Sequence, residues 1–335
     1  MKKATNIAVV GATGLVGKAF LELLESDHFL DSNIHLVASK KSKGQKISLR
    51  NSNHVVGALE DFDFSKMDLA FFSAGSEVAK EYAPKAVNKG CFVVDNSSCF
   101  RKDKTIPLIV PEVNGEALTE DTVPRIVANP NCQTIQMVVA LKPLHDLFVI
   151  KRIDVTTFQA VSGSGKLAQD ELQIQVRQQL KGEKPSSHIF NKQIAFNVLP
   201  HCGEFEKNSY TQEEMKLVWE THRILDANIE VSATCVRVPV VNGHSESVHI
   251  ETHEPMNIDI AKQCLSEAKG VKLLNEEGPE SYVTAVEVDG TDSVYVGRLR
   301  MDLWNKNRLN LWVVADNLRK GAALNSIQIA EILFT

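Results

Sequence analysis

Short apolar runs alternate with helical segments through the first 129 residues of the chain. The runs cover residues 6–11, 34–39, 68–75, 91–98 and 107–113. Several are apolar without strict alternation, which is typical of parallel strands buried on both faces. Helical periodicity follows at 15–26 and again at 77–90, where Gly90 is a plausible stop. This repetition predicts a Rossmann-type parallel α/β sheet.

The pattern changes near residue 129. The later runs are longer and more alternating, at 151–165, 229–240, 246–253, 293–302 and 309–316. They predict a largely antiparallel sheet with one covered face. Helical segments fall at 133–148, 166–182, 212–225 and 257–270. Residues 319–333 predict an amphipathic helix, which we expect to return to the first domain. The predicted fold is therefore α/β with a second α+β domain, divided as 1–129 plus 318–335 and 130–317.

Composition narrows the class of protein. A length of 335 residues favours two domains. The net charge of −5 argues against a large basic surface for nucleic acid. The apolar run after the N-terminus is too short for a signal peptide, and no segment approaches the roughly 20 apolar residues of a membrane span. Six cysteines without a CxxC pair favour free thiols in a reducing cytoplasm, and we assign no metal site.

A glycine-rich turn joins the first strand to the first helix. Gly11, Gly14 and Gly17 form a GxxGxxG pattern there. Gly11 permits a tight turn, Gly14 lets the backbone approach a pyrophosphate, and Gly17 lets helix and strand pack closely. The helix N-terminus offers free N–H groups to phosphate. The turn predicts dinucleotide binding over an ordinary strand–helix connection.

The loop after the second strand predicts which dinucleotide is bound. NAD-selective folds usually place an Asp or Glu there, whereas this chain has Ser39, Lys40, Lys41, Ser42 and Lys43. A carboxylate would repel a 2′-phosphate, but these hydroxyls and cations could bind one. The segment favours NADP, with a solvated lysine loop as the alternative.

Cys132 is the candidate nucleophile. It follows Asn131 at the predicted start of a helix, where the positive end of the dipole favours a thiolate. The alternative is a buried structural cysteine. A base is also needed, and His244 directly follows an Asn-Gly turn. His249, in the next strand, could equally be an ordinary sheet residue.

Other polar residues flank these candidates. Arg237 lies seven residues before His244, and Gln159 precedes a second Gly/Ser-rich loop at 162–165. Glu213 and Lys216 share one helix face at i, i+3 spacing, although a surface ion pair is the simpler interpretation. Arg101 follows a strand of the first sheet, where loops commonly form the site.

Seven segments taken together resemble the aspartate-β-semialdehyde dehydrogenase family along essentially the whole chain. They are GATGLVG, SSCFR followed by PEVN, NPNC, FQAVSGSGK, EEMK, RVPV followed by GH, and DNLRKGAALNSIQIAE. The resemblance implies NADPH-dependent reduction of aspartyl-β-phosphate to aspartate-β-semialdehyde and phosphate through a cysteine thioester. It also implies a role in lysine, threonine and methionine biosynthesis, and a homodimer built on the second domain's sheet.

The resemblance further implies roles for individual residues. Cys132 is the nucleophile, His244 the general acid/base, and Gln159 orients the acyl group. Arg237 binds the substrate α-carboxylate and Glu213 its amino group, while Arg101 and Lys216 bind phosphate. The cofactor contacts it implies, together with those expected from the glycine turn and the second-strand loop, are Gly11, Thr13, Gly14, Leu15, Val16, Gly17, Ser39, Lys41, Ser42, Ser162, Gly163 and Asn317.

One position departs from the family pattern, and two other functions compete. Relatives often carry arginine where this chain has Lys41, which keeps the charge but loses the planar fork, and this could permit some use of NAD.

An N-acetyl-γ-glutamyl-phosphate reductase would also use a cysteine, a histidine and NADP. The Glu213/Lys216 helix argues against it, because an acetylated amine carries no charge. A catalytically silent binding relative is disfavoured by the co-occurrence of Cys132, His244, Gln159 and Arg237.

Overall fold

The computed structural model describes residues 4–25, 29–118, 125–274, 278 and 281–334. The chain divides into two compact units. Unit 1 contains Met1–Asn131 together with Ala322–Thr335, and unit 2 contains Cys132–Gly321. Each unit has its own six-stranded sheet.

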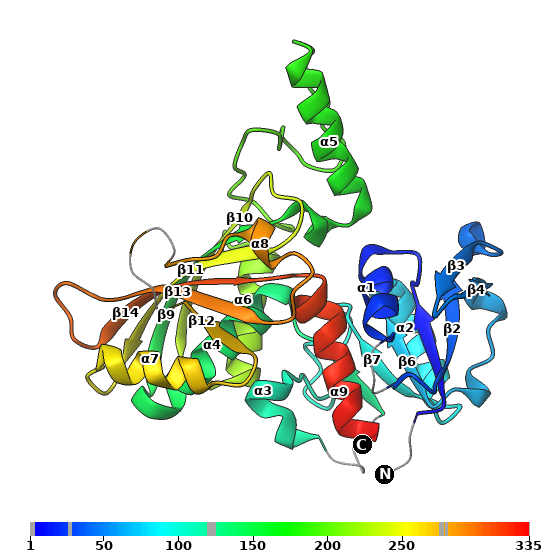
Figure 1. The fold of residues 1–335 in the computed structure, drawn as a ribbon, viewed down its shortest axis with the longest axis horizontal. Helices are drawn as coiled ribbons and strands as arrows, with labels where there is room; N and C mark the ends of the chain where they lie inside the picture. The colour runs from blue at the N-terminus through cyan, green and yellow to red at the C-terminus, as the bar shows by residue number, and fades with distance from the viewer. Residues whose placement is uncertain (1–3, 26–28, 119–124, 275–277, 279–280, 335) are drawn as a thin grey trace. The chain divides into compact units, whose positions relative to one another are not determined.

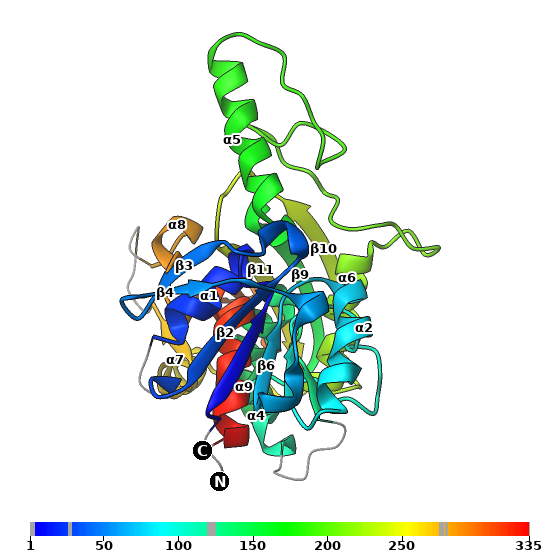
Figure 2. The same ribbon diagram turned by 90° about the vertical axis from the view of Figure 1, so that its right-hand side faces the viewer.

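Unit 1 is built on a fully parallel sheet. Its strand order is β5 (Gly57–Ala58), β2 (Asn33–Ala38), β1 (Asn6–Val10), β6 (Leu69–Phe72), β7 (Phe92–Asp95) and β8 (Ile126–Ala128). The central strands are buried on both faces, as their continuous apolar runs predict. Helices α1 (Leu15–Leu23) and α2 (Ser76–Val87) lie on opposite sides of this sheet (Figure 2). Strand order reverses between β1 and β6, where doubly wound sheets open a ligand crevice.

The C-terminal helix belongs to unit 1, as predicted. α9 (Leu324–Phe334) packs against α1 and β7, after a π-helical turn at Arg319–Ala323. The prediction that it is amphipathic is wrong, because most of its circumference is buried. Its polar residues are instead satisfied internally: the Asn325 amide donates to the Ile109 carbonyl and to Asn129.

The prediction of a strand at 107–113 is also wrong. Only Leu108 bridges to Ala128, and α3 (Pro111–Asn114) begins three residues later. Pro107 and Pro111 lack the N–H groups that a continuous ladder needs. The edge position is taken by β8. A hairpin of β3 (Lys46–Leu49) and β4 (Ser52–Val55), which sequence patterning missed, turns through two residues of positive φ.

Unit 2 contains the mixed sheet predicted as largely antiparallel. Its order is β10 (Glu230–Arg237), β9 (Ile150–Gln159), β11 (His244–Thr252), β14 (Arg308–Ala315), β13 (Val294–Met301) and β12 (Val271–Leu273). The three central pairings are antiparallel, and the two outer pairings are parallel.

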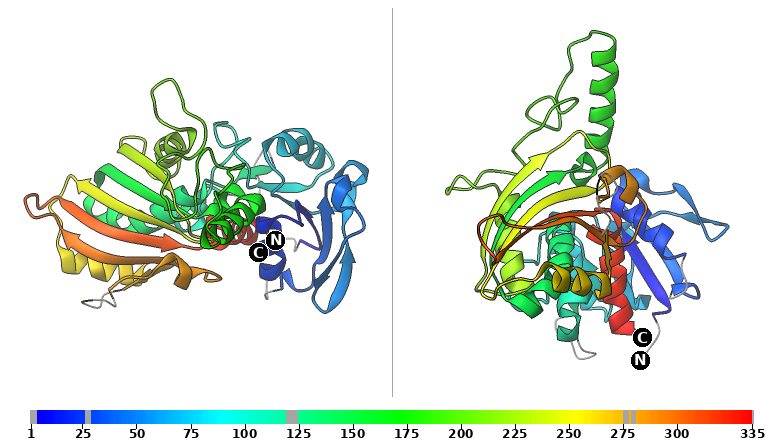
Figure 3. Two further views of the ribbon diagram at one scale, coloured as in Figure 1. Left: turned by 90° about the horizontal axis from the view of Figure 1, so that it is seen from above. Right: turned by 60° about the vertical axis from the view of Figure 1, so that its left-hand side comes forward.

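Helices cover one face of this sheet. They are α4 (Cys132–Phe148), α6 (Gln212–Ile224) and α7 (Ile258–Glu267), seen on one side of the strands in Figure 1. α5 (Lys166–Leu180) projects away from the sheet, as Figure 1 and the right view of Figure 3 show, and α8 (Ala285–Val288) is a short turn beside β14. The one-sided covering confirms the alternation predicted for these strands.

Candidate active site

Cys132 and His244 form a close pair within unit 2. Cys132 is the first residue of α4, where the positive end of the helix dipole favours a thiolate. Its side chain is partly exposed, so the alternative of a buried structural cysteine does not hold. Its Sγ lies 3.1 Å from Nε2 of His244, a residue 112 positions away. The fold therefore brings the predicted nucleophile and the predicted base into contact.

A backbone amide holds His244 from the other side of its ring. The N–H of Ala160 donates to Nδ1 over 3.1 Å. In a neutral ring the proton therefore lies on Nε2, which faces the sulfur. Burial, followed by the charge of Arg237, lowers the pKa of His244 to about 3. Near pH 7 the ring is neutral and presents an N–H to Cys132.

The carbonyl group of Ala160 also orients Arg237. Its Nη1 donates to the carbonyl of Ala160 over 2.6 Å, and the side chain is buried. Arg237 also lines a pocket with Lys192, His201 and Cys202. A guanidinium at the edge of a pocket suits a carboxylate, which it can bind through two parallel hydrogen bonds.

Glu213 and Lys216 form an ion pair on α6 that is connected to the thiol. The Nζ of Lys216 lies 2.6 Å from Glu213 Oε2, and the two side chains are 21% and 16% exposed. The Gln133 amide donates to Glu213 over 3.3 Å, and the Cys132 thiol donates to Gln133 over 3.4 Å. The interpretation of this pair as a solvated surface pair is therefore wrong.

Gln159 places a free amide beside the pair. It ends β9 and is the cross-strand neighbour of His244. The side chain is fully buried, and neither its Oε1 nor its Nε2 has a hydrogen-bond partner among the described residues. Such an amide can bind the oxygen of a reacting acyl group.

The loop after β9 is fixed by Asn317. The Asn317 amide donates to Ser162 Oγ over 3.0 Å, and the N–H of Gly243 donates to Asn317 Oδ1 over 2.8 Å. At Gly163, a Cβ would lie 3.1 Å from Nη1 of Arg237 and 3.2 Å from Cε1 of His244. Gly163 therefore keeps side-chain atoms out of the space around these two groups.

The glycine turn of unit 1 has the tight geometry that phosphate binding needs. Gly11 has φ +91°, and a Cβ there would meet the Ser73 carbonyl at 2.6 Å. A Cβ on Gly17 would clash with the backbone of Gly11 and Ala12. Gly14 caps α1 without a side-chain bond, which leaves the first N–H groups of the helix for a ligand. These residues fit a dinucleotide.

The second-strand loop lies beside this turn. Thr13 Oγ1 is 3.4 Å from Ser42 Oγ, so the two loops meet at their hydroxyls. Lys43 pairs with Asp61 at 2.8 Å, whereas Lys41 is exposed. Arg101, also in unit 1, is buried and donates to the Asn96 carbonyl over 2.8 Å.

Three of the other cysteines differ from Cys132 in being buried. All six are free. Burial raises the pKa of Cys91 to about 12 and of Cys202 to about 11, and it also raises that of Cys235. A thiolate is disfavoured at each of these three positions.

Three residues around the site were missed by sequence reasoning. Ala160 acts through its backbone and Gln133 by its place beside Cys132, so neither residue type signals a role. Gly321 lies in the segment DNLRKGAALNSIQIAE, and a Cβ there would come within 2.9 Å of the Cβ of Cys132. Its closeness to the sulfur depends on tertiary structure.

Two kinds of feature are absent from the described residues. Within that part of the chain, no helix is long and apolar enough to cross a membrane. The same residues contain no cluster of histidine, cysteine and carboxylate side chains suited to a metal ion.

Comparison with known proteins relates the whole chain to one group of enzymes. The family model "Semialdehyde dehydrogenase, NAD binding domain" matches residues 6–121, and "Semialdehyde dehydrogenase, dimerisation domain" matches residues 141–320. An aspartate-semialdehyde dehydrogenase of Legionella pneumophila is 51% identical, covering 99% of this chain and 96% of the relative. One of Shewanella violacea is 50% identical, covering 99% and 98%. A crystal structure of aspartate semialdehyde dehydrogenase II from Vibrio cholerae, complexed with ASA, has a TM-score of 0.96 at 46% identity and covers 99% and 98% of the two chains.

Proposed function

The chain belongs to the aspartate-semialdehyde dehydrogenase family, and we propose that it reduces aspartyl-β-phosphate to aspartate-β-semialdehyde and phosphate with NADPH. The reaction is reversible and passes through a thioester on Cys132. The observation that carries the proposal is the 3.1 Å contact between Sγ of Cys132 and Nε2 of His244 at a helix N-terminus. In the cell, the product would enter lysine, threonine and methionine biosynthesis.

Cys132 performs the covalent step. Its thiolate attacks the acyl carbon, the carbon–oxygen bond to phosphate breaks, and phosphate leaves with the bond electrons. NADPH, when bound, supplies the hydride that reduces the thioester. The amide of Gln159 binds the acyl oxygen, on which negative charge develops. The Nε2–H of His244 stabilises the thiolate before attack.

His244 also acts as the general acid/base. In the oxidative direction the ring must take a proton at Nε2 as the thiohemiacetal loses hydride. Nε2 can accept only when the ring proton lies on Nδ1, where the Ala160 N–H now donates. We therefore expect the hydrogen bond between Ala160 and His244 to break during this step.

The substrate-binding roles follow the charges of unit 2. Arg237 binds the α-carboxylate, and Glu213 binds the amino group. Lys216 and Arg101 bind the phosphate, with Lys216 exchanging its bond to Glu213 for one to the substrate. An N-acetylated substrate would leave Glu213 without a cation, so the amino-acid substrate is favoured over an acetylated one.

Cofactor specificity is assigned to NADP. Gly11, Gly14 and Gly17 hold the pyrophosphate with Thr13, Leu15 and Val16. Ser39, Lys41 and Ser42 bind the 2′-phosphate, and Ser162, Gly163 and Asn317 complete the contacts. Since lysine binds phosphate as a point charge and not as a fork, we expect some residual use of NAD.

Assembly and location complete the proposal. A homodimer is proposed on the open face of the unit 2 sheet, in the region matched by the dimerisation-domain model. Residues 1–129 plus 318–335 are assigned to the cofactor and residues 130–317 to catalysis and dimerisation. Six free cysteines support a place in the reducing cytoplasm.

The direct test is reduction of NADP⁺ with aspartate-β-semialdehyde, with and without phosphate. We expect turnover that requires phosphate and is faster with NADP⁺ than with NAD⁺. N-acetylglutamate-γ-semialdehyde plus phosphate is the matched alternative substrate. Faster turnover of the acetylated compound would overturn the proposal, and so would the absence of turnover with both compounds.

A further inference from the structure

The covered face of β11 carries a second titratable residue two positions after His244. Glu246 is fully buried, and its strand neighbours are Thr157 on β9 and Val313 on β14. Alternation along the strand puts its side chain on the same face as His244. A buried carboxyl group without an obvious partner needs an explanation, because burying an unpaired charge is unfavourable.

Gln136 connects this region to the catalytic pair. It lies one turn after Cys132 on α4, so the two side chains share a helix face. Its Nε2 donates to the carbonyl of His244 over 3.5 Å. Gln136 is therefore linked to Cys132 through the helix and to His244 through a hydrogen bond.

Gln136 and Glu246 are left with acceptors only. Gln136 Oε1 and both carboxyl oxygens of Glu246 are buried without a hydrogen-bond partner among the described residues. Two acceptors cannot bond to each other, but one proton on the carboxyl group would turn an oxygen into a donor. The side chains are close enough to interact: burial raises the pKa of Glu246 well above its usual value, and Gln136 opposes this more weakly.

No cation compensates Glu246 in the described part of the chain. Among the described residues, burial raises its pKa and Gln136 lowers it more weakly, and no charged group contributes. The titratable residues on its own strand and on the elements packed around it are Cys132, Lys142, His145, Asp146, Lys151, Arg152, Asp154, Glu230, Cys235, Arg237, His244, His249, Glu251, Tyr295, Arg298, Arg300 and Arg308. None of them stabilises a carboxylate at position 246, so the neutral acid is the form that fits the site.

We propose that Glu246 is a positioning residue for the catalytic pair. As a neutral carboxylic acid it donates its proton to Oε1 of Gln136. This bond fixes the Gln136 amide so that its Nε2 supports the backbone of His244. The inference deepens the proposed function, since a positioning role has meaning only if Cys132 and His244 act together.

Two substitutions separate a neutral donor from a charged group. Glu246→Gln keeps a donor toward Gln136 without a titratable proton, so we expect alkylation of Cys132 by iodoacetamide to keep its wild-type rate and pH profile. Glu246→Met fills similar space without a donor, so we expect the alkylation rate to change by about tenfold, the effect of one lost hydrogen bond. With aspartate-β-semialdehyde, kcat should fall in this variant while the KM for NADP⁺ stays unchanged.

The ionisation state has its own readout in unfolding. An acid whose pKa is raised in the folded protein stabilises it at low pH and loses that contribution as pH rises. The wild type should therefore lose stability relative to Glu246→Gln as pH increases above about 4.5, the ordinary pKa of glutamate. Urea unfolding of both proteins across pH measures this difference.

Thr157→Val is the matched control. Thr157 is opposite Glu246, is equally buried, and its hydroxyl has no hydrogen-bond partner among the described residues, so this near-isosteric change should leave alkylation unaltered. Three results would overturn the inference. They are an unchanged alkylation rate in Glu246→Met, a change of the alkylation rate in Glu246→Gln as large as that in Glu246→Met, or a stability difference between wild type and Glu246→Gln that does not vary with pH. Alkylation and unfolding need no substrate, so these results stay interpretable even if the proposed reaction fails.

Discussion

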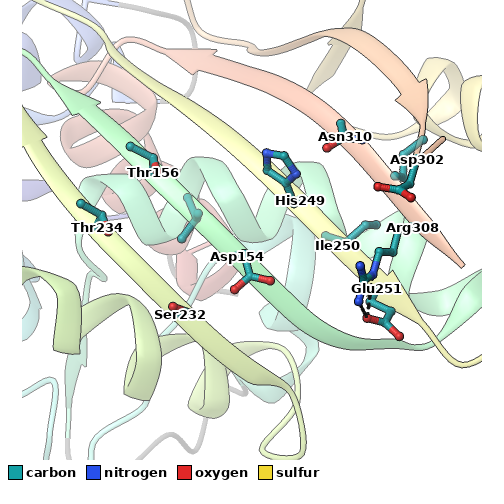
Figure 4. Close-up of a pocket in the computed structure, with 12 residues that line it drawn as sticks. Asp154, Thr156, Ser232, Thr234, His249, Ile250, Glu251, Asp302, Arg308 and Asn310 are labelled. Carbon is teal, nitrogen blue, oxygen red and sulfur yellow. Dashed lines mark hydrogen bonds and ion pairs between the residues drawn. The ribbon is translucent and has the colours of Figure 1, made fainter. Parts of the chain in front are cut away.

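The two faces of the unit 2 sheet are built by the same strands but carry opposite kinds of chemistry. His244 and His249 show the difference, because both lie on β11 and their positions differ by five, an odd number. His244 points to the helix-covered face, contacts Cys132 and is buried. His249 points to the open face, where it lines a pocket with Asp154 and Asn310 (Figure 4). Alternation along a strand thus decides which histidine can take part in catalysis.

The ionisable side chains also differ between the two faces of the sheet. On the covered face, burial keeps His244 neutral by lowering its pKa. On the open face, Lys151 and Arg308 both bind Glu251, and their hydrogen bonds lower its pKa. Exposed pairs of this kind contribute little stability and are screened by salt. Burial therefore keeps His244 neutral on the covered face, while the open face holds exposed charges that compensate one another.

The largest expected effect on the covered face is at the sulfur of Cys132. Cys132→Ala removes the nucleophile, and we expect turnover to fall by at least about 10⁴-fold. Cys264→Ala, at a partly exposed cysteine on α7, is the matched control and should retain turnover. Steady-state kinetics of both variants measure the difference. Turnover above a tenth of the wild-type value in Cys132→Ala would contradict a catalytic role for Cys132 on the covered face.

The paired histidines give the next largest effect. We expect His244→Ala to lower kcat by about 10²–10⁴-fold, the usual contribution of a general acid/base. Cofactor binding, followed by NADPH fluorescence, should be unchanged. His249→Ala is expected to leave kcat within about threefold, because its side chain is on the other face. Similar losses in both variants would contradict the division between the faces.

Arginines on the two faces sharpen the comparison further. Arg237→Lys keeps the charge but loses the planar fork, so we expect the KM for aspartate-β-semialdehyde to rise by about 10–100-fold. Arg308→Lys makes the same change on the open face and should leave that KM unaltered. Initial rates at varied substrate concentration test both. An unchanged KM in Arg237→Lys would assign carboxylate binding to another residue.

The smallest expected effect is on stability. His244 has its pKa lowered to about 3 in the folded protein, against 6.5 for a free side chain. The contribution of the neutral ring to the free energy of unfolding is complete above pH 6.5 and is lost as pH falls toward 3. Each tenfold difference in proton affinity between the folded and unfolded protein corresponds to about 1.4 kcal/mol. His244→Asn should therefore unfold with a weaker dependence on pH in this range. Urea unfolding at several pH values measures this dependence. If the free energy of unfolding changed with pH in the same way in both proteins, the ring would not be buried as a neutral group.

Much of the fold was predictable from patterning. Continuous apolar runs predicted the parallel strands of unit 1, and alternation predicted a covered face in unit 2. The strand predicted at 107–113 failed because Pro107 and Pro111 remove backbone donors from an otherwise apolar run. The β3–β4 hairpin was missed because Arg50 and Asn51 supply its positive φ values without a glycine.

The candidate site was predictable where the proposed role belongs to a side chain itself. Cys132, His244, Gln159 and Arg237 stand in recognisable motifs, and the fold of unit 2 gathers them. The contributions of Ala160 and Gln136 were not predictable, because a peptide N–H and an amide become important only when β9, β11 and α4 are in register. The odd spacing of His244 and His249 was visible in the sequence, but which face would be covered was not.

The most direct test of catalysis on the covered face is to trap the acyl-enzyme. The protein would be incubated with aspartate-β-semialdehyde and NADP⁺ without phosphate, quenched in acid, and analysed by intact-mass and peptide mass spectrometry. We predict a β-aspartyl group on the peptide that contains Cys132, removed when phosphate is added before the quench and absent from Cys132→Ala. An acyl group on another cysteine, or none while NADP⁺ is reduced, would contradict a thioester mechanism at Cys132.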